Sequence, residues 1–130
     1  MCNILHERNL IDYTFLPAIY EREKIAPTAF GNLVAIPHPI VPKSRKTFLT
    51  VCTLKKPILW ADKQVQFICL ISIKKNTEEE LQPMYDLISE IIDNNCLVQH
   101  LIKASTYHDF VKQLSKCGIN FISCRNHVVK

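Results

Sequence analysis

The alternation of apolar and polar positions predicts strands in the middle of the chain. Three short apolar runs, each bounded by glycine, proline or lysine-rich breaks, are typical of strands: 33–36, 48–54 and 65–73. The run 65–73 is apolar on nearly both faces, so we expect a central strand that is covered on each side. Residues 55–57 and 62–63 are expected to interrupt the strands around a short apolar patch, and 30–32 to form a turn.

Helical periodicity precedes these strands. Residues 3–10 are typical of the end of a helix, and a second helix is predicted after Asp12 or Thr14. Pro17 favours the later start, because proline is tolerated only in the first turn of a helix. The predicted apolar face of this second helix consists of Leu16, Ile19 and Tyr20.

Helical periodicity also follows the strands. Apolar residues recur at three- and four-residue steps in the set Leu81, Met84, Tyr85, Ile88, Ile91 and Ile92. A shorter helix is expected over 97–102, and Thr106 with Asp109 resembles a capping box that opens a last helix. Cys117 and Gly118 predict its end. Helices before, between and after strands indicate one α/β domain, a three-layer α/β/α sandwich with a mixed central sheet.

Composition narrows the class of protein. The chain has 130 residues, 48% of them apolar, and a net charge of +4, which fits a single globular domain and excludes a disordered chain. Two glycines are too few for a glycine-rich nucleotide loop, and the six cysteines form no zinc-ligand spacing. Residues 1–10 lack the apolar core of a secretory signal, and 65–73 is too short to span a membrane. We therefore expect a cytoplasmic domain with reduced cysteines.

One histidine stands out as a candidate for chemistry. His38 follows an apolar strand, at the kind of strand end where open α/β sheets tend to bind ligands. Pro37 and Pro39 restrict the backbone on either side, so the imidazole projects from a stiff segment. The alternative interpretation is a surface turn histidine that two prolines hold in place.

A second candidate is Arg22, at the end of the predicted second helix. Its guanidinium offers a planar fork of donors to a phosphate or carboxylate. For an isolated Glu-Arg-Glu-Lys run at 21–24, however, a solvated helix end that complements the helix dipole is the more common arrangement.

The two candidates belong to one longer pattern. The segment 22–39, REKIAPTAFGNLVAIPHP, resembles the active-site segment of the mannitol/fructose-type (type 2) enzyme IIA domain of the phosphoenolpyruvate-dependent sugar phosphotransferase system. The family pattern is an arginine at a helix end, a threonine-containing loop, a glycine, a short apolar strand and then Pro-His. The match includes the sixteen-residue step from Arg22 to His38, and it extends more loosely over residues 1–115.

The resemblance implies a function for each candidate. His38 would accept a phosphoryl group from a phosphohistidine on the carrier protein HPr and pass it to a cysteine or histidine of a partner such as an enzyme IIB domain. Arg22 would hold the phosphoryl oxygens. A histidine suits this role because its neutral ring has a free nucleophilic nitrogen at cellular pH. No metal or organic cofactor is implied, and neither membrane insertion nor direct nucleic-acid binding is expected, since the basic residues are scattered.

One departure from the family concerns a second histidine, which sugar-transporting members carry beside the first. The matching position here is Glu80, in the stretch NTEEEL at 76–81. An ionised carboxylate cannot donate to a phosphoryl oxygen and would repel it. The structural alternative is a capping box formed by Thr77 and Glu80, although Pro83 would then fall inside the helix.

A second departure is that residues 1–130 are expected to begin after the family's first strand and part of its first helix. The missing second histidine and the segments 30–33 and 55–58 resemble enzyme IIA-like domains of antiterminator-type transcriptional regulators, where the domain senses sugar-transport flux beside other regulatory domains. Two alternatives remain open: an interaction domain that signals by docking without phosphorylation, and a stand-alone sugar-transport enzyme IIA.

Three further surface features have alternative interpretations. The basic residues Lys43, Arg45 and Lys46 are expected to form a solvated loop, or else to attract an acidic partner or the phosphate. Phe30 and Trp60 are expected to pack in the core, with a partner contact as the alternative.

Overall fold

The computed structural model describes residues 1–77 and 80–116. The helices are α1 (Cys2–Glu7), α2 (Phe15–Ile25), α3 (Gln82–Asp93), α4 (Asn95–Lys103) and α5 (Tyr107–Lys116). The strands are β1 (Ala29–Gly31), β2 (Leu33–Ala35), β3 (Phe48–Trp60) and β4 (Lys63–Ser72). No helix within these residues is long and apolar enough to cross a membrane.

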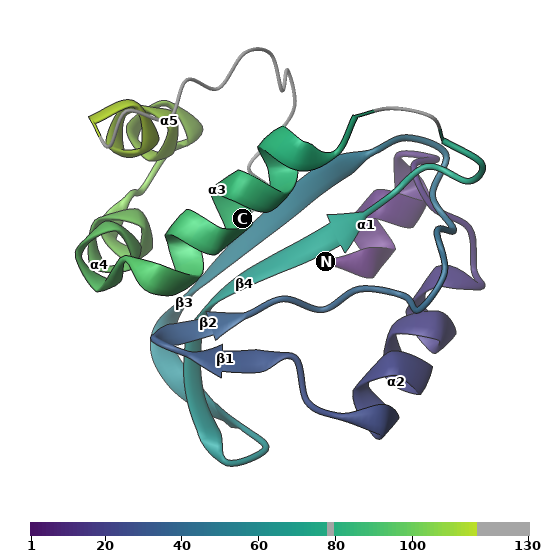
Figure 1. Ribbon diagram of the computed structural model, residues 1–130, viewed down its shortest axis with the longest axis horizontal. Helices are drawn as coiled ribbons and strands as arrows, with labels where there is room; N and C mark the ends of the chain where they lie inside the picture. The colour runs from purple at the N-terminus through teal and green to yellow at the C-terminus, as the bar shows by residue number, and fades with distance from the viewer. Residues whose placement is uncertain (78–79, 117–130) are drawn as a thin grey trace.

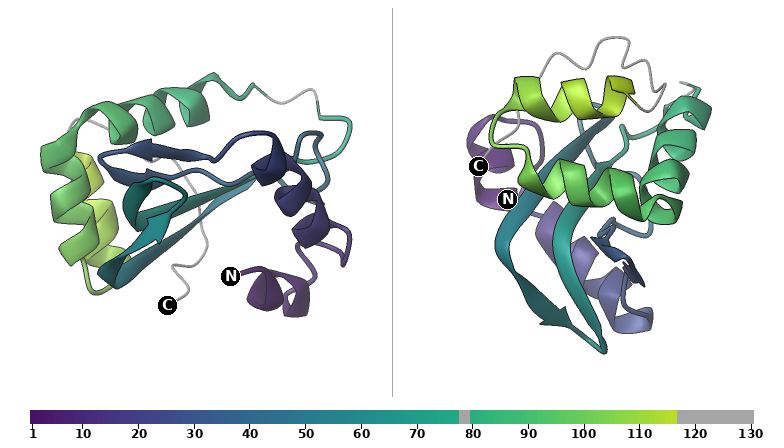
Figure 2. Two further views of the ribbon diagram at one scale, coloured as in Figure 1. Left: turned by 90° about the horizontal axis from the view of Figure 1, so that it is seen from below. Right: turned by 90° about the vertical axis from the view of Figure 1, so that its left-hand side faces the viewer.

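The strands form one mixed sheet in the order β1-β2-β4-β3 (Figure 1). β2 and β4 run parallel, whereas β1 with β2 and β3 with β4 are antiparallel. Helices α3, α4 and α5 cover one face of the sheet, and α1 and α2 lie on the other side (Figure 2). The predicted three-layer α/β/α arrangement with a mixed sheet is confirmed.

β4 is the central strand, as its sequence predicts. Phe67, Cys69 and Ile71 belong to the buried cluster that includes α3, α4 and α5. On the opposite side, Leu70 packs with the buried residues of α1 and α2. Since successive side chains of a strand point to opposite faces, this strand needs apolar residues at consecutive positions.

The predicted interruption at 55–57 is wrong, because β3 runs unbroken from Phe48 to Trp60. Its pairing with β4 shifts register between Thr53 and Ile58, so an irregularity in the ladder accommodates the polar stretch and Pro57. β3 is an edge strand, where proline is tolerated because one side of the strand lacks a hydrogen-bonded neighbour. The predicted turn at 30–32 is only partly correct, since residues 29–31 form the short strand β1 ahead of the turn.

The predicted face of α2 also needs correction. The helix begins after Thr14, as Pro17 indicates, but its buried residues are Phe15 and Ile19. Tyr20 is 60% exposed, and Leu16 is exposed as well. Phe15 with Ile19 and Leu16 with Tyr20 are two apolar pairs at helical spacing. The pair that starts at Phe15 is the buried one, because it packs in the cluster around Leu70.

The first residues of α3 and α5 are set by proline tolerance and side-chain capping. α3 begins at Gln82 and not after Thr77, so the predicted Thr77–Glu80 capping box is wrong. The later start places Pro83 in the first turn, where its missing N–H costs no helical hydrogen bond. The predicted cap of α5 is confirmed, because the Asp109 N–H donates to Thr106 Oγ1 at 3.1 Å. The predicted stop at Cys117 and Gly118 lies outside the described residues.

The central position of Cys69 makes a testable prediction. Burial raises the pKa of the Cys69 thiol to about 12, so little thiolate forms at pH 8. Iodoacetamide under native conditions should leave Cys69 unmodified while it alkylates the exposed Cys96. Peptide mass mapping after a timed quench measures both rates. Alkylation of Cys69 as fast as that of Cys96 in the folded chain would contradict a buried central strand.

Candidate functional site

His38 lies just beyond β2, on a segment that remains attached to the sheet. The Ile71 N–H donates to the Pro37 carbonyl at 3.0 Å, which continues the pairing with β4 past the end of β2. The ring nitrogen Nδ1 lies 2.8 Å from the Ile36 carbonyl oxygen. Since a carbonyl oxygen can only accept, this contact requires the proton on Nδ1. In the neutral ring the other nitrogen, Nε2, then carries the free lone pair.

A cavity of about 410 Å³ opens beside His38. Its walls come from the segment 36–42, the end of β4, the α3 face and β1, and they are mostly apolar: Phe30, Ile71, Tyr85, Ile88 and Ile92 are among them. Two of these apolar side chains face solvent, since Phe30 is 52% and Tyr85 45% exposed. His38 therefore sits at the edge of an apolar depression rather than among polar groups.

Phe30 and Trp60 have different environments. Trp60 packs against the buried cluster that contains Ala29 and Ile68, as expected. The expectation of a core position for Phe30 is wrong, because its ring contributes to the wall of the His38 cavity. Alternation along β1 explains the difference, since Ala29 points into the core and Phe30 to the other side.

The Glu23 carboxylate organises the segment that leads to His38. Both of its oxygens accept from the Thr28 N–H at 3.2 Å, and the Thr28 hydroxyl donates to Oε1. Oε2 also accepts from the indole N–H of Trp60 at 3.2 Å. One charged group thus joins the end of α2, the loop before β1 and the end of β3.

This junction continues to the histidine through the backbone. Thr28 is fully buried, and its carbonyl accepts from the Ile36 N–H at 2.9 Å. Ile36 in turn supplies the carbonyl that holds Nδ1 of His38. Glu23 and Thr28 were not predicted from the sequence as site-building residues, although both lie inside the segment on which the resemblance rests.

The structure places Arg22 at the end of α2, where its guanidinium donates to the Ala26 carbonyl at 2.8 Å. Glu80 is exposed and precedes the first turn of α3. Within the described residues, the wall of the His38 cavity includes neither Arg22 nor Glu80. The same part of the chain holds no group of three or more His, Cys, Asp or Glu side chains arranged to bind a metal ion.

Residues 1–117 match the family described as "Phosphoenolpyruvate-dependent sugar phosphotransferase system, EIIA 2". The chain is 47% identical over 103 residues to the probable licABCH operon regulator of Bacillus subtilis, covering 79% of this chain and 16% of the regulator. It is 23% identical to the transcriptional regulator ManR of the same organism, covering 88% of this chain and 18% of that protein. The chain thus spans less than a fifth of either regulator.

The fold is shared with a solved phosphotransferase structure. The complex of enzyme IIAMTL and phosphorylated enzyme IIBMTL from Escherichia coli contains a similar chain, with a TM-score of 0.69 and 19% sequence identity. The similarity covers 86% of this chain and 80% of that one.

The Glu23 junction predicts a measurable loss of stability. In Glu23→Gln the amide NH2 would face other donors, so we expect a decrease of about 1–3 kcal/mol in the free energy of unfolding. Urea titration followed by the fluorescence of Trp60, the single tryptophan, measures this and reports any change around the indole. Glu21→Gln is the matched control, because Glu21 pairs with Lys24 at the exposed surface and should change stability by less than about 0.5 kcal/mol. Equal effects of the two variants would refute the junction.

Proposed function

The chain belongs to the EIIA 2 family of the phosphoenolpyruvate-dependent sugar phosphotransferase system, and on this premise we propose that His38 accepts a phosphoryl group on Nε2. The Nε2 lone pair forms the new N–P bond while the P–N bond of the donor phosphohistidine breaks, and the donor ring keeps the electron pair of that bond. In such transfers the protein contributes positioning and charge stabilisation more than covalent chemistry.

The observation that carries this proposal is the contact between Nδ1 of His38 and the Ile36 carbonyl. It holds the ring in one tautomer and one orientation, at 2.8 Å from a buried backbone segment. A fixed ring needs less reorganisation when the phosphorus approaches, and Nδ1–H stays bonded after Nε2 is modified. The half-buried position beside an open cavity gives a partner access to the ring.

Arg22 is proposed to stabilise the phosphoryl oxygens. A guanidinium has five N–H donors, and the hydrogen bond to the Ala26 carbonyl uses NH1. The remaining donors are available to an oxyanion, and a charge-assisted contact of this kind is stronger than a neutral one.

The donor and the biological setting are proposed from the relatives. HPr is the proposed donor, with an enzyme IIB domain as a second one. The apolar surface around His38, with Phe30 and Tyr85 exposed, fits a protein partner better than a small polar substrate. The 47% identity to an operon regulator supports a cytoplasmic sensor domain in a longer, sugar-responsive transcriptional regulator, rather than a stand-alone transport component.

Glu80 favours a second candidate function. It is an exposed carboxylate just before α3, at the position where the resemblance places a second histidine. If its charge prevents phosphorylation, the domain signals by docking to neighbouring domains while His38 remains unmodified.

Intact-mass measurement distinguishes these candidates. The chain incubated with phosphoenolpyruvate, enzyme I and HPr at mildly alkaline pH should gain one phosphoryl group, and His38→Ala should gain none. Modification of His38→Ala would refute the assignment. An unmodified wild type beside phosphorylated HPr and enzyme IIB would favour the docking candidate, and a gain of phosphorylation in Glu80→His would identify Glu80 as the cause.

A second prediction concerns the guanidinium. Arg22→Lys keeps the charge but loses the planar fork, so the initial rate of phosphorylation should fall by about tenfold or more, equivalent to one charge-assisted hydrogen bond. Arg8→Lys, an exposed arginine at the end of α1, is the matched control and should leave the rate unchanged. Rapid-quench sampling with phosphorylated HPr measures both. An unchanged rate in Arg22→Lys would remove Arg22 from the site.

A further inference from the structure

A second cavity, of about 420 Å³, lies between α2 and the loop that follows His38. Its lining is mainly aliphatic, with Pro17 and Ala18 from the helix and Ile40 and Val41 from the loop. Ile40 is 59% and Val41 53% exposed. We call this cavity the α2 groove. Its volume lies in the range of protein ligand pockets, so it has room for an apolar side chain.

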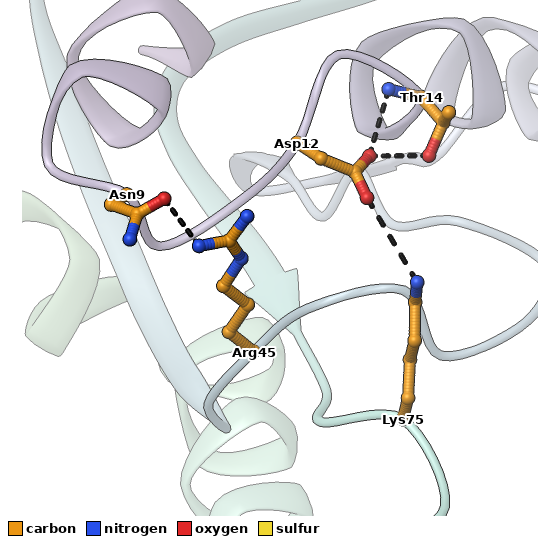
Figure 3. Close-up of polar contacts among 5 residues, drawn as sticks. All are labelled: Asn9, Asp12, Thr14, Arg45 and Lys75. Atoms are coloured by element: carbon orange, nitrogen blue, oxygen red, sulfur yellow. Dashed lines mark hydrogen bonds and ion pairs between the residues drawn. The ribbon is translucent and has the colours of Figure 1, made fainter.

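One cationic side chain lines the α2 groove, and two more lie on segments next to it. Lys43 contributes to its lining, and Lys75 Nζ lies 3.9 Å from Oδ2 of Asp12. The Arg45 guanidinium donates to Oδ1 of Asn9, on the same segment between α1 and α2 (Figure 3). We call Lys43, Arg45 and Lys75 the cationic cluster.

The negative charge within this cluster is limited. Hydrogen bonds from the side chain and backbone of Thr14 hold the pKa of Asp12 below its usual value, and Lys75 and Lys43 act in the same direction. Asp12 is therefore ionised at neutral pH and offsets one of the three cations. Glu21, which also lines the groove, pairs with Lys24 at 3.0 Å.

Backbone pairing brings the segment that carries Lys43 and Arg45 next to the segment that carries Lys75. Ser44 forms an isolated parallel bridge with Lys74. The Ser44 N–H donates to the Ile73 carbonyl at 3.1 Å, and the Lys75 N–H donates to the Ser44 carbonyl at 3.0 Å. Because Ser44 itself is buried, the flanking cations are carried on a fixed backbone. The sequence alone groups Lys43 and Arg45 on one loop but does not bring Lys75 next to them.

We propose that the α2 groove and the cationic cluster form one docking surface for an acidic segment of a partner protein, with an apolar side chain of that segment in the groove. The carboxylates would contact Lys43, Arg45 and Lys75 at the edge of the groove. Charge complementarity accelerates association, and an apolar anchor in a pocket contributes most of the affinity.

The aliphatic lining distinguishes a protein segment from a nucleic acid. Nucleic acids bind through phosphates, base edges and stacked rings, none of which matches the walls formed by Pro17, Ala18, Ile40 and Val41. A peptide supplies both acidic and apolar side chains.

The docking surface adjoins His38, because Ile40 and Val41 line both cavities. A phosphoryl group adds nearly two negative charges. Phosphorylation of His38 should therefore weaken the binding of an acidic segment, a coupling that rests on the proposed function. The docking surface itself is tested on the unphosphorylated chain.

The test uses a peptide of eight glutamates around one central leucine, titrated into ¹⁵N-labelled chain at low ionic strength. Amide shifts should centre on residues 14–21 and 40–45. Lys43→Gln combined with Lys75→Gln should weaken binding about fivefold, since each exposed charge is worth a factor of about two to three. Ala18→Glu, which places a carboxylate in the groove, should abolish it. Replacement of the central leucine of the peptide by alanine should weaken binding about fivefold, as the double lysine variant does.

Lys55→Gln combined with Lys56→Gln is the matched control. These exposed lysines of β3 lie near the start of β4, whereas Lys75 follows its end (Figure 1). Equal weakening by both double variants, shifts away from the groove, or tighter binding of a DNA duplex at the same amides would overturn the proposal.

Binding should also weaken once the chain is phosphorylated, and unchanged binding would overturn the coupling. A chain that accepts no phosphoryl group refutes the proposed function, while the titrations still decide the docking surface.

Discussion

Burial of β4 on both faces is the constraint on which the rest of the structure depends. Phe67 is fully buried and stacks with Phe110 of α5 at a centroid distance of 6.2 Å. Leu70 is only 2% exposed on the opposite face, against α1 and α2. A strand covered in this way requires a neighbour on each edge, and β2 pairs with it in parallel register. The Pro37 carbonyl extends that pairing, so the position of His38 follows from the position of β4.

A carboxylate completes the placement of the histidine. Glu23 accepts hydrogen bonds from Thr28 and Trp60, residues that are distant in sequence and adjacent in space. Partly buried polar groups are stable only when their hydrogen-bonding capacity is used, so these contacts favour a single arrangement of the loop before β1. The Thr28 carbonyl fixes Ile36 by accepting from its N–H, and the Ile36 carbonyl determines which nitrogen of His38 carries the proton. A phosphoryl acceptor needs this kind of order more than it needs additional reactive groups.

The surface around the site combines two kinds of recognition. The wall beside His38 is apolar, and beyond Ile40 and Val41 the neighbouring groove has Lys43 in its lining, with Lys75 close by through its ion pair to Asp12. Apolar contact contributes affinity once partners meet, and charge acts over the longer distances at which they approach. Because the loop 36–43 contributes to both cavities, a change of charge at the histidine reaches the docking surface through a few residues. This proximity suits a domain that reports its phosphorylation state to a partner.

The sequence by itself determined the local features of this protein. The nearly continuous apolar run at 65–73 identified the central strand, and Thr106 and Asp109 identified the start of α5, because these signals depend on neighbouring residues. The segment from Arg22 to His38 identified the family and predicted the histidine as the acceptor. Tertiary structure decided the rest. It selected the Phe15 stripe of α2, carried β3 through residues 55–57, placed Phe30 in a cavity wall and brought Lys43 beside Lys75. Each of these outcomes depends on contacts between segments far apart in the chain, and such contacts leave no periodic signal in the sequence.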